Sequence, residues 1–211
     1  MTNLKTRYTD GARRGFFKLG IVLARAGVTA DMLTVFGLLL QIAGLPLIIT
    51  GHFGWAVLVG AVAAICDALD GAVARAGAGS TRAGAFLDST TDRISELLIA
   101  AALVVYFVRE GSWPPVIAAL VFMGAAQMVS YTRARAEALD VDCKVGLMSR
   151  PERLVLLGIG FLCSGWHLGE TSVLVWVLYL LAVLTSLTVA HRMVHVLRKL
   201  RREERRAEGG G

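Results

Sequence analysis

The stretch that decides the fold is residues 67–92, which read DALDGAVARAGAGSTRAGAFLDSTTD. It covers the end of one mostly apolar run, near residues 53–75, and the start of the next, near residues 85–108. Four aspartates therefore fall within two expected membrane-spanning helices. An unpaired charge in a bilayer costs about 2.5–3.5 kcal/mol even on the lenient insertion scale, so these residues need compensating partners.

The composition makes the membrane the natural solvent of this chain. Of its 211 residues, 55% are hydrophobic and only 18% are charged, and the mean hydropathy is +0.62. A soluble domain with this balance would expose far too much apolar surface. The length supports a single domain over residues 1–211, and no Pro- or Ser-rich linker divides it.

The apolar runs predict an all-α integral membrane protein with six transmembrane helices. A spanning helix needs about 20 mostly apolar residues. The fifth expected span is the weakest, because its continuously apolar part is short. The spans are expected near residues 32–51, 53–75, 85–108, 115–139, 150–168 and 172–197.

Both ends of the chain are basic. Residues 1–30 are expected to form an amphipathic interfacial helix, residues 31–198 the six-helix bundle, and residues 199–211 a basic cytoplasmic tail touching anionic lipid. In the interfacial helix, apolar side chains would enter the membrane surface and basic ones would face phosphates: Phe16, Phe17, Ile21 and Val22 against Arg13, Arg14, Lys18 and Arg25.

The distribution of Lys and Arg orients the bundle. Nearly all of them fall in the N-terminal segment, residues 75–83, residues 133–153 and the C-terminal tail, whereas the alternate loops hold only Arg109. The positive-inside rule then places both termini in the cytoplasm, in a cell-membrane protein. The net charge of +6 does not indicate nucleic-acid binding, because no RNA-type aromatic motif accompanies the basic clusters.

The spacing of the aspartates predicts a metal site. One pair is spaced i, i+3 and the other i, i+4, so each pair projects from one helical face. Antiparallel helices joined by a short turn would bring both pairs together near the cytoplasmic surface. Facing carboxylates repel one another, and an all-oxygen ligand set suits Mg²⁺ or Mn²⁺. The expected ligands are Asp67, Asp70, Asp88 and Asp92, and the alternative is neutralisation by Arg75, Arg82 and Arg93.

The same residues carry a resemblance to a known family. The run Asp67-Ala-Leu-Asp70-Gly71-Ala-Val-Ala74-Arg75 is followed by eight residues, Gly84, three residues, Asp88, three residues and Asp92. This pattern resembles the complete signature of the CDP-alcohol phosphotransferase family. The resemblance implies a membrane enzyme that transfers a phosphatidyl group from a CDP-lipid, and it also suggests a homodimer.

The resemblance also implies roles for single residues. Asp67 and Asp88 would bridge two Mg²⁺ or Mn²⁺ ions, Asp70 would complete one site and Asp92 the other. Asp92 would also act as the base. The CDP-lipid would contact Gly71, Arg75 and Thr81 and, at the start of the first span, Asp31, Met32, Leu33 and Thr34.

Two arginine-rich segments bear on the acceptor alcohol. Residues 130–137 read SYTRARAE at the end of the fourth span, and residues 150–153 read RPER at the start of the fifth. Arginine forks bind phosphate oxygens bidentately, so these segments indicate an acceptor that itself carries a phosphate. The alternative is that the arginines only anchor helix ends to lipid headgroups.

The arrangement SYTRARAEA followed by RPERL is similar to the phosphatidylinositol phosphate synthase branch of the family. That branch joins CDP-diacylglycerol to inositol 1-phosphate, giving phosphatidylinositol phosphate and CMP. The similarity implies that Arg133, Arg135 and Arg153 bind the acceptor phosphate, with Ser130 nearby.

Three alternatives stay open. The first is the same chemistry with glycerol phosphate as acceptor, and the second is the same chemistry with a CDP-archaeol-type ether lipid as donor. The third is a divalent-cation transporter whose aspartates line a permeation path. The sequence argues against the transporter, because the acidic residues cluster at one side of the membrane beside a Gly/Arg pattern suited to a nucleotide.

Overall fold

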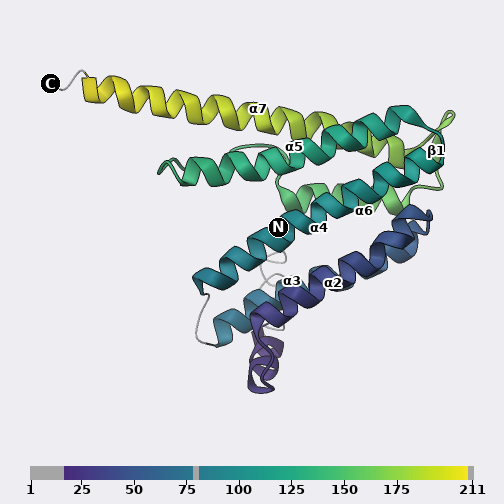
Figure 1. Cartoon of the computed structure of the whole chain (residues 1–211), viewed down its shortest axis with the longest axis horizontal. Coiled ribbons are helices and arrows are strands. Elements are labelled where there is room, and N and C mark those ends of the chain that lie inside the picture. The colour runs from purple at the N-terminus through teal and green to yellow at the C-terminus, as the bar shows by residue number, and fades with distance from the viewer. Residues whose placement is uncertain (1–16, 78–80, 209–211) are drawn as a thin grey trace, which may run out of the picture. The chain divides into compact units, whose positions relative to one another are not determined.

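The computed structural model describes residues 17–77 and 81–208 (Figure 1). The described residues are almost entirely helical, which confirms the all-α prediction. Residues 17–25 are helical, in agreement with a helix before the first span, whereas Arg13, Arg14 and Phe16 lie outside the described residues. The interfacial position of this helix stays a prediction.

The chain forms two compact units that share one helix. The first unit takes residues 1–46 and 55–95, and the second takes residues 47–54 and 96–211. The division falls within α4 (Arg82–Arg109), so the early turns of this helix belong to the first unit and the later turns to the second.

In the first unit, α2 (Ala30–Ile49) and α3 (Phe53–Ala76) pack as antiparallel neighbours. A Cβ added to Gly37 would lie 3.6 Å from the Cβ of Cys66, and one added to Gly44 would lie 3.1 Å from Cγ1 of Val59. Small residues let helix backbones approach closely where lipid supplies no hydrophobic driving force. Gly20 of the preceding helix lies against the backbone of Ala72 in the same way.

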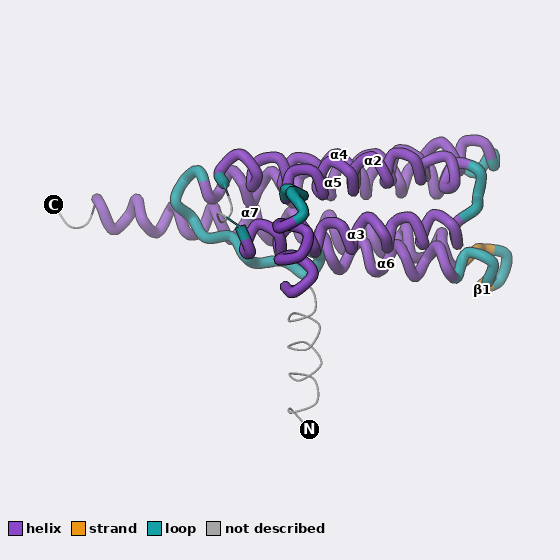
Figure 2. Tube along the Cα trace, turned by 90° about the horizontal axis from the view of Figure 1, so that it is seen from below, coloured by secondary structure: helices purple, strands orange, loops and turns teal. Residues whose placement is uncertain are grey.

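In the second unit, α7 (Val173–Glu208) packs against α5 (Trp113–Glu137) and α6 (Arg150–Leu162) (Figure 1). A hairpin of β1 (His167–Leu168) and β2 (Thr171–Ser172) connects α6 to α7 (Figure 2). Near this end, the ring of Phe53 stacks on Phe161 with a centroid distance of 5.1 Å and meets Tyr106 edge-on.

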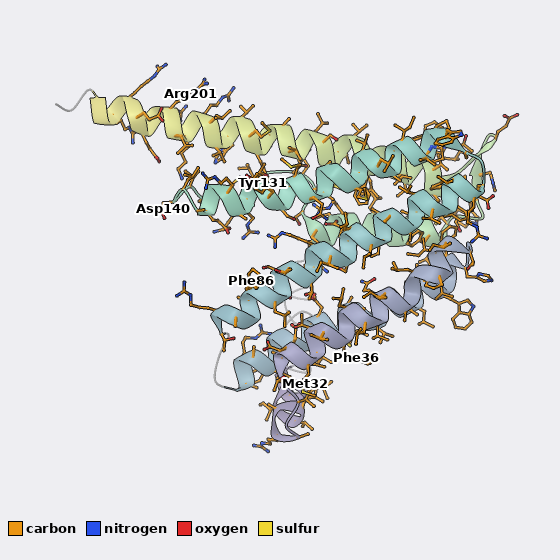
Figure 3. All side chains as sticks on the ribbon, viewed as in Figure 1. Met32, Phe36, Phe86, Tyr131, Asp140 and Arg201 are labelled. Atoms are coloured by element: carbon orange, nitrogen blue, oxygen red, sulfur yellow. The ribbon has the colours of Figure 1, made fainter. Side chains whose placement is uncertain are left out.

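Four of the described helices, α2, α3, α5 and α7, are long and apolar enough to cross a membrane. Large apolar side chains on α2, among them Met32 and Phe36, are exposed, as expected of a surface in lipid (Figure 3). The 13 residues of α6 span only about 20 Å, less than the ~30 Å hydrocarbon core. The helix ends before the expected limit at residue 168, so the count of six spans stays a prediction.

Gly160 offers a test of the packing between α6 and α7. A Cβ at this position would lie 2.9 Å from Cγ1 of Val177, whereas a Cβ at Gly158 of the same helix would meet nothing within 4 Å. Gly160→Ala should lower the free energy of unfolding by about 1–3 kcal/mol relative to Gly158→Ala, because overpacking strains a close contact. Thermal unfolding in detergent micelles measures the difference, and equal stability of the two variants would contradict this packing.

Candidate metal and substrate site

Three of the four predicted metal ligands come together in the first unit. Asp67 and Asp70 lie near the end of α3, and Asp88 lies in the second turn of α4. One carboxylate oxygen from each of the three residues can be chosen so that all three oxygens lie within 4.8 Å of one another. The i, i+3 spacing puts Asp67 and Asp70 on one face of α3, and the roles of all four aspartates as metal ligands stay predictions.

This carboxylate cluster, Asp67, Asp70 and Asp88, fits a divalent cation in both chemistry and size. Mg²⁺ takes oxygen ligands at about 2.1 Å, so oxygens on opposite sides of the ion lie roughly 4.2 Å apart. The spread of up to 4.8 Å is of that order, and small side-chain rotations would close the difference. All the donors are carboxylate oxygens, the ligands that suit Mg²⁺ and Mn²⁺.

Asp70 is the most enclosed member of the cluster, with only 8% of its surface exposed. The hydroxyl Oγ1 of Thr34 donates a hydrogen bond of 2.7 Å to Oδ2 of Asp70. This bond joins α2 to α3 and fixes the orientation of the carboxylate. Thr34 was predicted from the family resemblance to contact the CDP-lipid, and in the structure it supports a predicted metal ligand.

Asp92 is not part of the carboxylate cluster. It follows Asp88 by one helical turn on α4 and is half-buried. Residues spaced i, i+4 lie on one face of a helix, so Asp92 projects from the same side of α4 as Asp88. Its predicted roles as fourth ligand and as base stay predictions.

Two residues predicted to bind the CDP-lipid, Asp31 and Thr81, lie beside Gly84. A Cβ on Gly84 would lie 3.1 Å from both Oδ1 of Asp31 and Oγ1 of Thr81. The N–H of Gly84 donates to Oγ1 of Thr81 at 2.9 Å, which caps the first turn of α4. The start of α2 and the start of α4 therefore meet at a glycine that leaves room for both side chains.

The other predicted CDP-lipid residues lie on α3 and α2. The guanidinium of Arg75 covers Gly71, where an added Cβ would lie 3.2 Å from Nη1. On α2, Leu33 is half-buried, and the N–H of the exposed Met32 donates to Oγ1 of Thr29 at 3.2 Å.

The predicted acceptor residues belong to the second unit and differ in environment. Ser130 is half-buried on α5, while Arg133 and Arg135 are exposed on the last turns of that helix. Nε of Arg133 donates to Oε1 of Glu137 at 2.8 Å, and such an exposed pair contributes little to stability. Arg153, in contrast, is only 1% exposed.

The guanidinium of Arg153 is held from two sides. Nε and Nη2 donate to Oε1 and Oε2 of Glu96, each at 2.6 Å, and Nη1 donates to the carbonyl of Met148 at 2.9 Å. Glu96 is itself buried. The bonds to Glu96 join α6 to α4.

Sequence reasoning missed two charged residues of this unit, Glu96 and Arg192. Arg192 of α7 is 6% exposed and donates to the carbonyls of Val129 at 2.6 Å and Val145 at 2.8 Å. Glu96 and Arg192 fall inside expected spans, so the rule that charges within membrane spans are functional would have indicated both.

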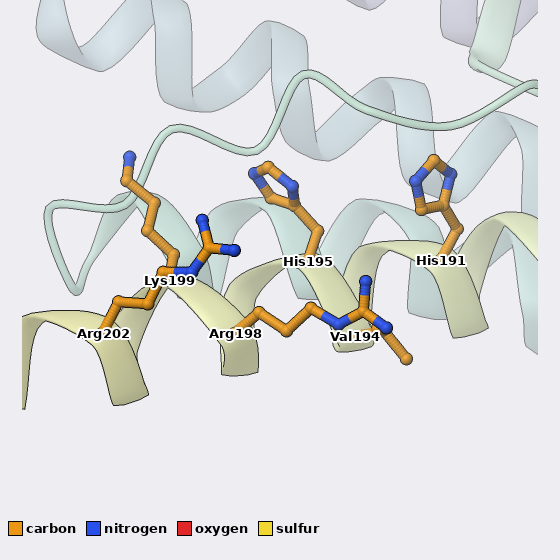
Figure 4. Close-up of a pocket in the computed structure, with 6 residues that line it drawn as sticks. All are labelled: His191, Val194, His195, Arg198, Lys199 and Arg202. Carbon is orange, nitrogen blue, oxygen red and sulfur yellow. The ribbon is translucent and has the colours of Figure 1, made fainter.

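A groove runs along the later turns of α7 (Figure 4). It is lined by His191, Val194, His195, Arg198, Lys199 and Arg202, and the two imidazoles project from the same side of the helix. The groove includes the start of the basic tail, whose contact with anionic lipid stays a prediction.

Apolar helices that carry a cluster of aspartates fit a metal-dependent membrane enzyme. Comparison with known proteins identifies the family. A sequence model described as CDP-alcohol phosphatidyltransferase matches residues 27–188. The chain belongs to the CDP-alcohol phosphatidyltransferase family, which confirms the resemblance found in residues 67–92.

Two relatives are similar to this chain over most of its length. The chain is 41% identical over 182 residues to a phosphatidylinositol phosphate synthase of Mycobacteroides abscessus, covering 85% of this chain and 82% of the relative. It is 32% identical over 181 residues to an archaetidylinositol phosphate synthase of Methanothermobacter thermautotrophicus, covering 84% and 87%.

Solved structures agree with the sequence comparison. The crystal structure of Mycobacterium tuberculosis phosphatidylinositol phosphate synthase with CDP-DAG bound matches with a TM-score of 0.80 at 33% identity, covering 87% of this chain and 94% of that one. The same enzyme in complex with manganese and citrate matches with a TM-score of 0.79 at 33% identity, covering 86% and 88%.

The bond between Thr34 and Asp70 predicts a change in metal affinity. Thr34→Val keeps the shape of the side chain but removes the hydroxyl, so it should weaken Mn²⁺ binding by about 10-fold or more, as loss of a residue that orients a metal ligand does. Thr34→Ser keeps the hydroxyl and should bind Mn²⁺ nearly as the wild type does. Titration of the purified protein with Mn²⁺ measures both, and equal affinities for Val and Ser would contradict the orienting role.

Proposed function

We propose that this chain transfers the phosphatidyl group of CDP-diacylglycerol to inositol 1-phosphate, giving phosphatidylinositol phosphate and CMP. The observation that carries the proposal is the carboxylate cluster, because it belongs to a chain 33% identical to a synthase solved both with CDP-DAG and with manganese. Family membership makes the chain a phosphatidyltransferase, and the phosphorylated acceptor is the step that the proposal adds.

The chemistry requires charge neutralisation and proton transfer. The acceptor hydroxyl oxygen forms a new bond to the phosphatidyl phosphorus, and the bond from that phosphorus to the bridging oxygen of the pyrophosphate breaks. Divalent ions held by the aspartates would neutralise the charge on the leaving CMP. Asp92 would accept the proton of the attacking hydroxyl, as a carboxylate base can.

The proposed ligand set keeps the assignments implied by the resemblance. Two Mg²⁺ or Mn²⁺ ions would be bridged by Asp67 and Asp88 and completed by Asp70 and Asp92. The half-buried or exposed positions around Gly84 and Gly71 would hold the cytidine diphosphate part of the donor, through Asp31, Met32, Leu33, Thr34, Gly71, Arg75 and Thr81.

The acceptor phosphate is assigned to Ser130, Arg133, Arg135 and Arg153. Charge supports this assignment, since three of the four residues are arginines. A phosphate dianion attracts guanidinium groups and forms charge-assisted hydrogen bonds with them. Arginine forks also match the geometry of phosphate oxygens.

We also propose the arrangement in the membrane. Six spans would place both termini and the active site on the cytoplasmic side of the cell membrane. The four long apolar helices would be completed by α4 and by α6 extended through its polar flanks. The exposed apolar side chains of α2 and α5 would meet lipid or a second copy of the chain, in a homodimer.

A second candidate differs only in the donor lipid. The 32% identity to an archaetidylinositol phosphate synthase favours a CDP-archaeol-type ether lipid as the alternative substrate. The headgroup chemistry is the same in both cases, so the same aspartates and arginines would serve. Family membership argues against the divalent-cation transporter.

An acceptor assay tests the proposed function. Purified protein with Mg²⁺ is supplied with CDP-diacylglycerol and radiolabelled inositol 1-phosphate, free inositol or glycerol phosphate, and the lipid product is counted. Inositol phosphate should be the preferred acceptor, and addition of EDTA should abolish transfer because the charge on CMP is no longer neutralised. Robust product from free inositol with none from its phosphate would overturn the assignment, and a parallel reaction with the CDP-ether lipid distinguishes the donors.

A further inference from the structure

The ion pair between Glu96 and Arg153 is deeply enclosed. The two side chains are 4% and 1% exposed, and both carboxylate oxygens accept from the guanidinium at 2.6 Å. Moving two charges out of water costs several kcal/mol per ion, so a buried pair of this kind is weak evidence for stability. The geometry of the pair instead indicates that Glu96 positions the guanidinium of Arg153.

Arg153 also helps to hold the connection between α5 and α6 in place. Its Nη1 donates to the carbonyl of Met148, and the N–H of the same residue donates to Oγ1 of Thr188 at 3.2 Å. Nε of Arg192 donates to the carbonyl of Val145. Side chains from α6 and α7 thus hold the backbone of residues 145–148 at three points.

Gly146 shows how closely this segment is fitted. Its φ of +124° is a conformation that side chains rarely adopt, and an added Cβ would lie 2.5 Å from Cγ2 of Thr188. The backbone of residues 145–148 therefore has little freedom to shift while these bonds persist.

The same network reaches the helix that carries the predicted phosphate ligands. Nη1 of Arg192 donates to the carbonyl of Val129, the residue before Ser130 on α5. One arginine thus ties residues 145–148 to the turn of α5 from which Ser130 and Arg133 follow. The position of Arg153 and of these α5 residues is set by a single set of hydrogen bonds within the second unit.

Arg153 keeps donor capacity beyond the bonds described. A guanidinium has five N–H donors, and the bonds to Glu96 and Met148 use three of them, on Nε, Nη2 and Nη1. Glu96 takes one edge of the fork, which leaves a hydrogen on each Nη for a phosphate oxygen. A carboxylate that grips one edge of a guanidinium fixes the plane in which the other edge lies.

We propose that Glu96 is a positioning residue of the acceptor site, acting through Arg153. It holds the guanidinium in the plane needed for the acceptor phosphate and keeps residues 145–148 against α5. The inference rests on the proposed function, since it takes a phosphorylated alcohol as the acceptor. It assigns Glu96 no contact with the donor lipid or with the metal.

Glu96→Gln tests this role, because it keeps the size of the side chain and removes its charge. The KM for inositol 1-phosphate should rise by about 10-fold or more, the scale of a lost hydrogen bond between charged groups. The KM for CDP-diacylglycerol and the affinity for Mn²⁺ should stay within about two-fold, and kcat should change less than the acceptor KM. Glu96→Asp keeps the charge and should restore part of the acceptor affinity.

Two further variants complete the experiment. Glu110→Gln makes the same change at an exposed residue just after α4 and should leave every parameter as in the wild type. Arg153→Lys keeps the charge of the partner but loses the fork, and it should raise the acceptor KM as Glu96→Gln does. If Glu96→Gln does not fold, the acceptor KM of Arg153→Lys and of Glu96→Asp decides the question.

The outcomes separate this inference from the proposed function. Wild-type protein that makes no lipid from inositol phosphate would refute the function itself. Active wild type together with folded Glu96→Gln and Arg153→Lys of unchanged acceptor KM would overturn the positioning role alone. A lower melting temperature with an unchanged acceptor KM would reduce the pair to a structural contact and would equally overturn it.

Discussion

Repulsion among the carboxylates of Asp67, Asp70 and Asp88 is the constraint on which the first unit depends. At an effective dielectric constant of about 20, two unit charges 4.8 Å apart repel by roughly 3.5 kcal/mol, so three pairs amount to roughly 10 kcal/mol. Total stability is only about 5–15 kcal/mol for a domain. Protons or positive charge must relieve this repulsion, and divalent cations would do so with the oxygen ligands they prefer.

The close packing of α2, α3 and the start of α4 brings the members of this cluster together. Gly37, Gly44 and Gly84 let the helices approach, and the hydroxyl of Thr34 turns Asp70 into place from α2. In the second unit, the buried Arg153 and Arg192 donate hydrogen bonds to backbone carbonyls of the connection between α5 and α6 and so hold it in place. Local backbone placement in each unit is thus tied to charged or polar side chains.

Much of this arrangement could be predicted from residues 67–92. The i, i+3 spacing places Asp67 and Asp70 on one face of a helix, and a short turn between antiparallel helices brings Asp88 to them, although Asp92 stays outside the cluster. The ends of α6 were harder to predict, because an apolar run does not reveal that the helix stops at Leu162 and gives way to a hairpin. Hydropathy measures how well residues suit lipid, and it does not measure where backbone hydrogen bonding changes.

The surroundings of Arg153 could be predicted only in part, because its buried partners are far from it in the sequence. The segments that contain Arg133 and Arg153 stand out as basic clusters, but Glu96 and Arg192 are single charges within apolar runs. Their partners lie 57 residues away for Glu96 and 47 and 63 residues away for Arg192, and no local pattern specifies such contacts. Tertiary structure is needed to show that Arg153 is buried and paired.

Anomalous diffraction from crystals grown with Mn²⁺ would locate the cations of the carboxylate cluster. Mn²⁺ peaks are expected in contact with carboxylate oxygens of Asp67, Asp70 and Asp88, with bond lengths of about 2.0–2.3 Å. The peak beside Asp70 should weaken in Asp70→Asn crystals. Mn²⁺ bound only elsewhere, with these carboxylates neutralised by guanidinium groups alone, would contradict this prediction.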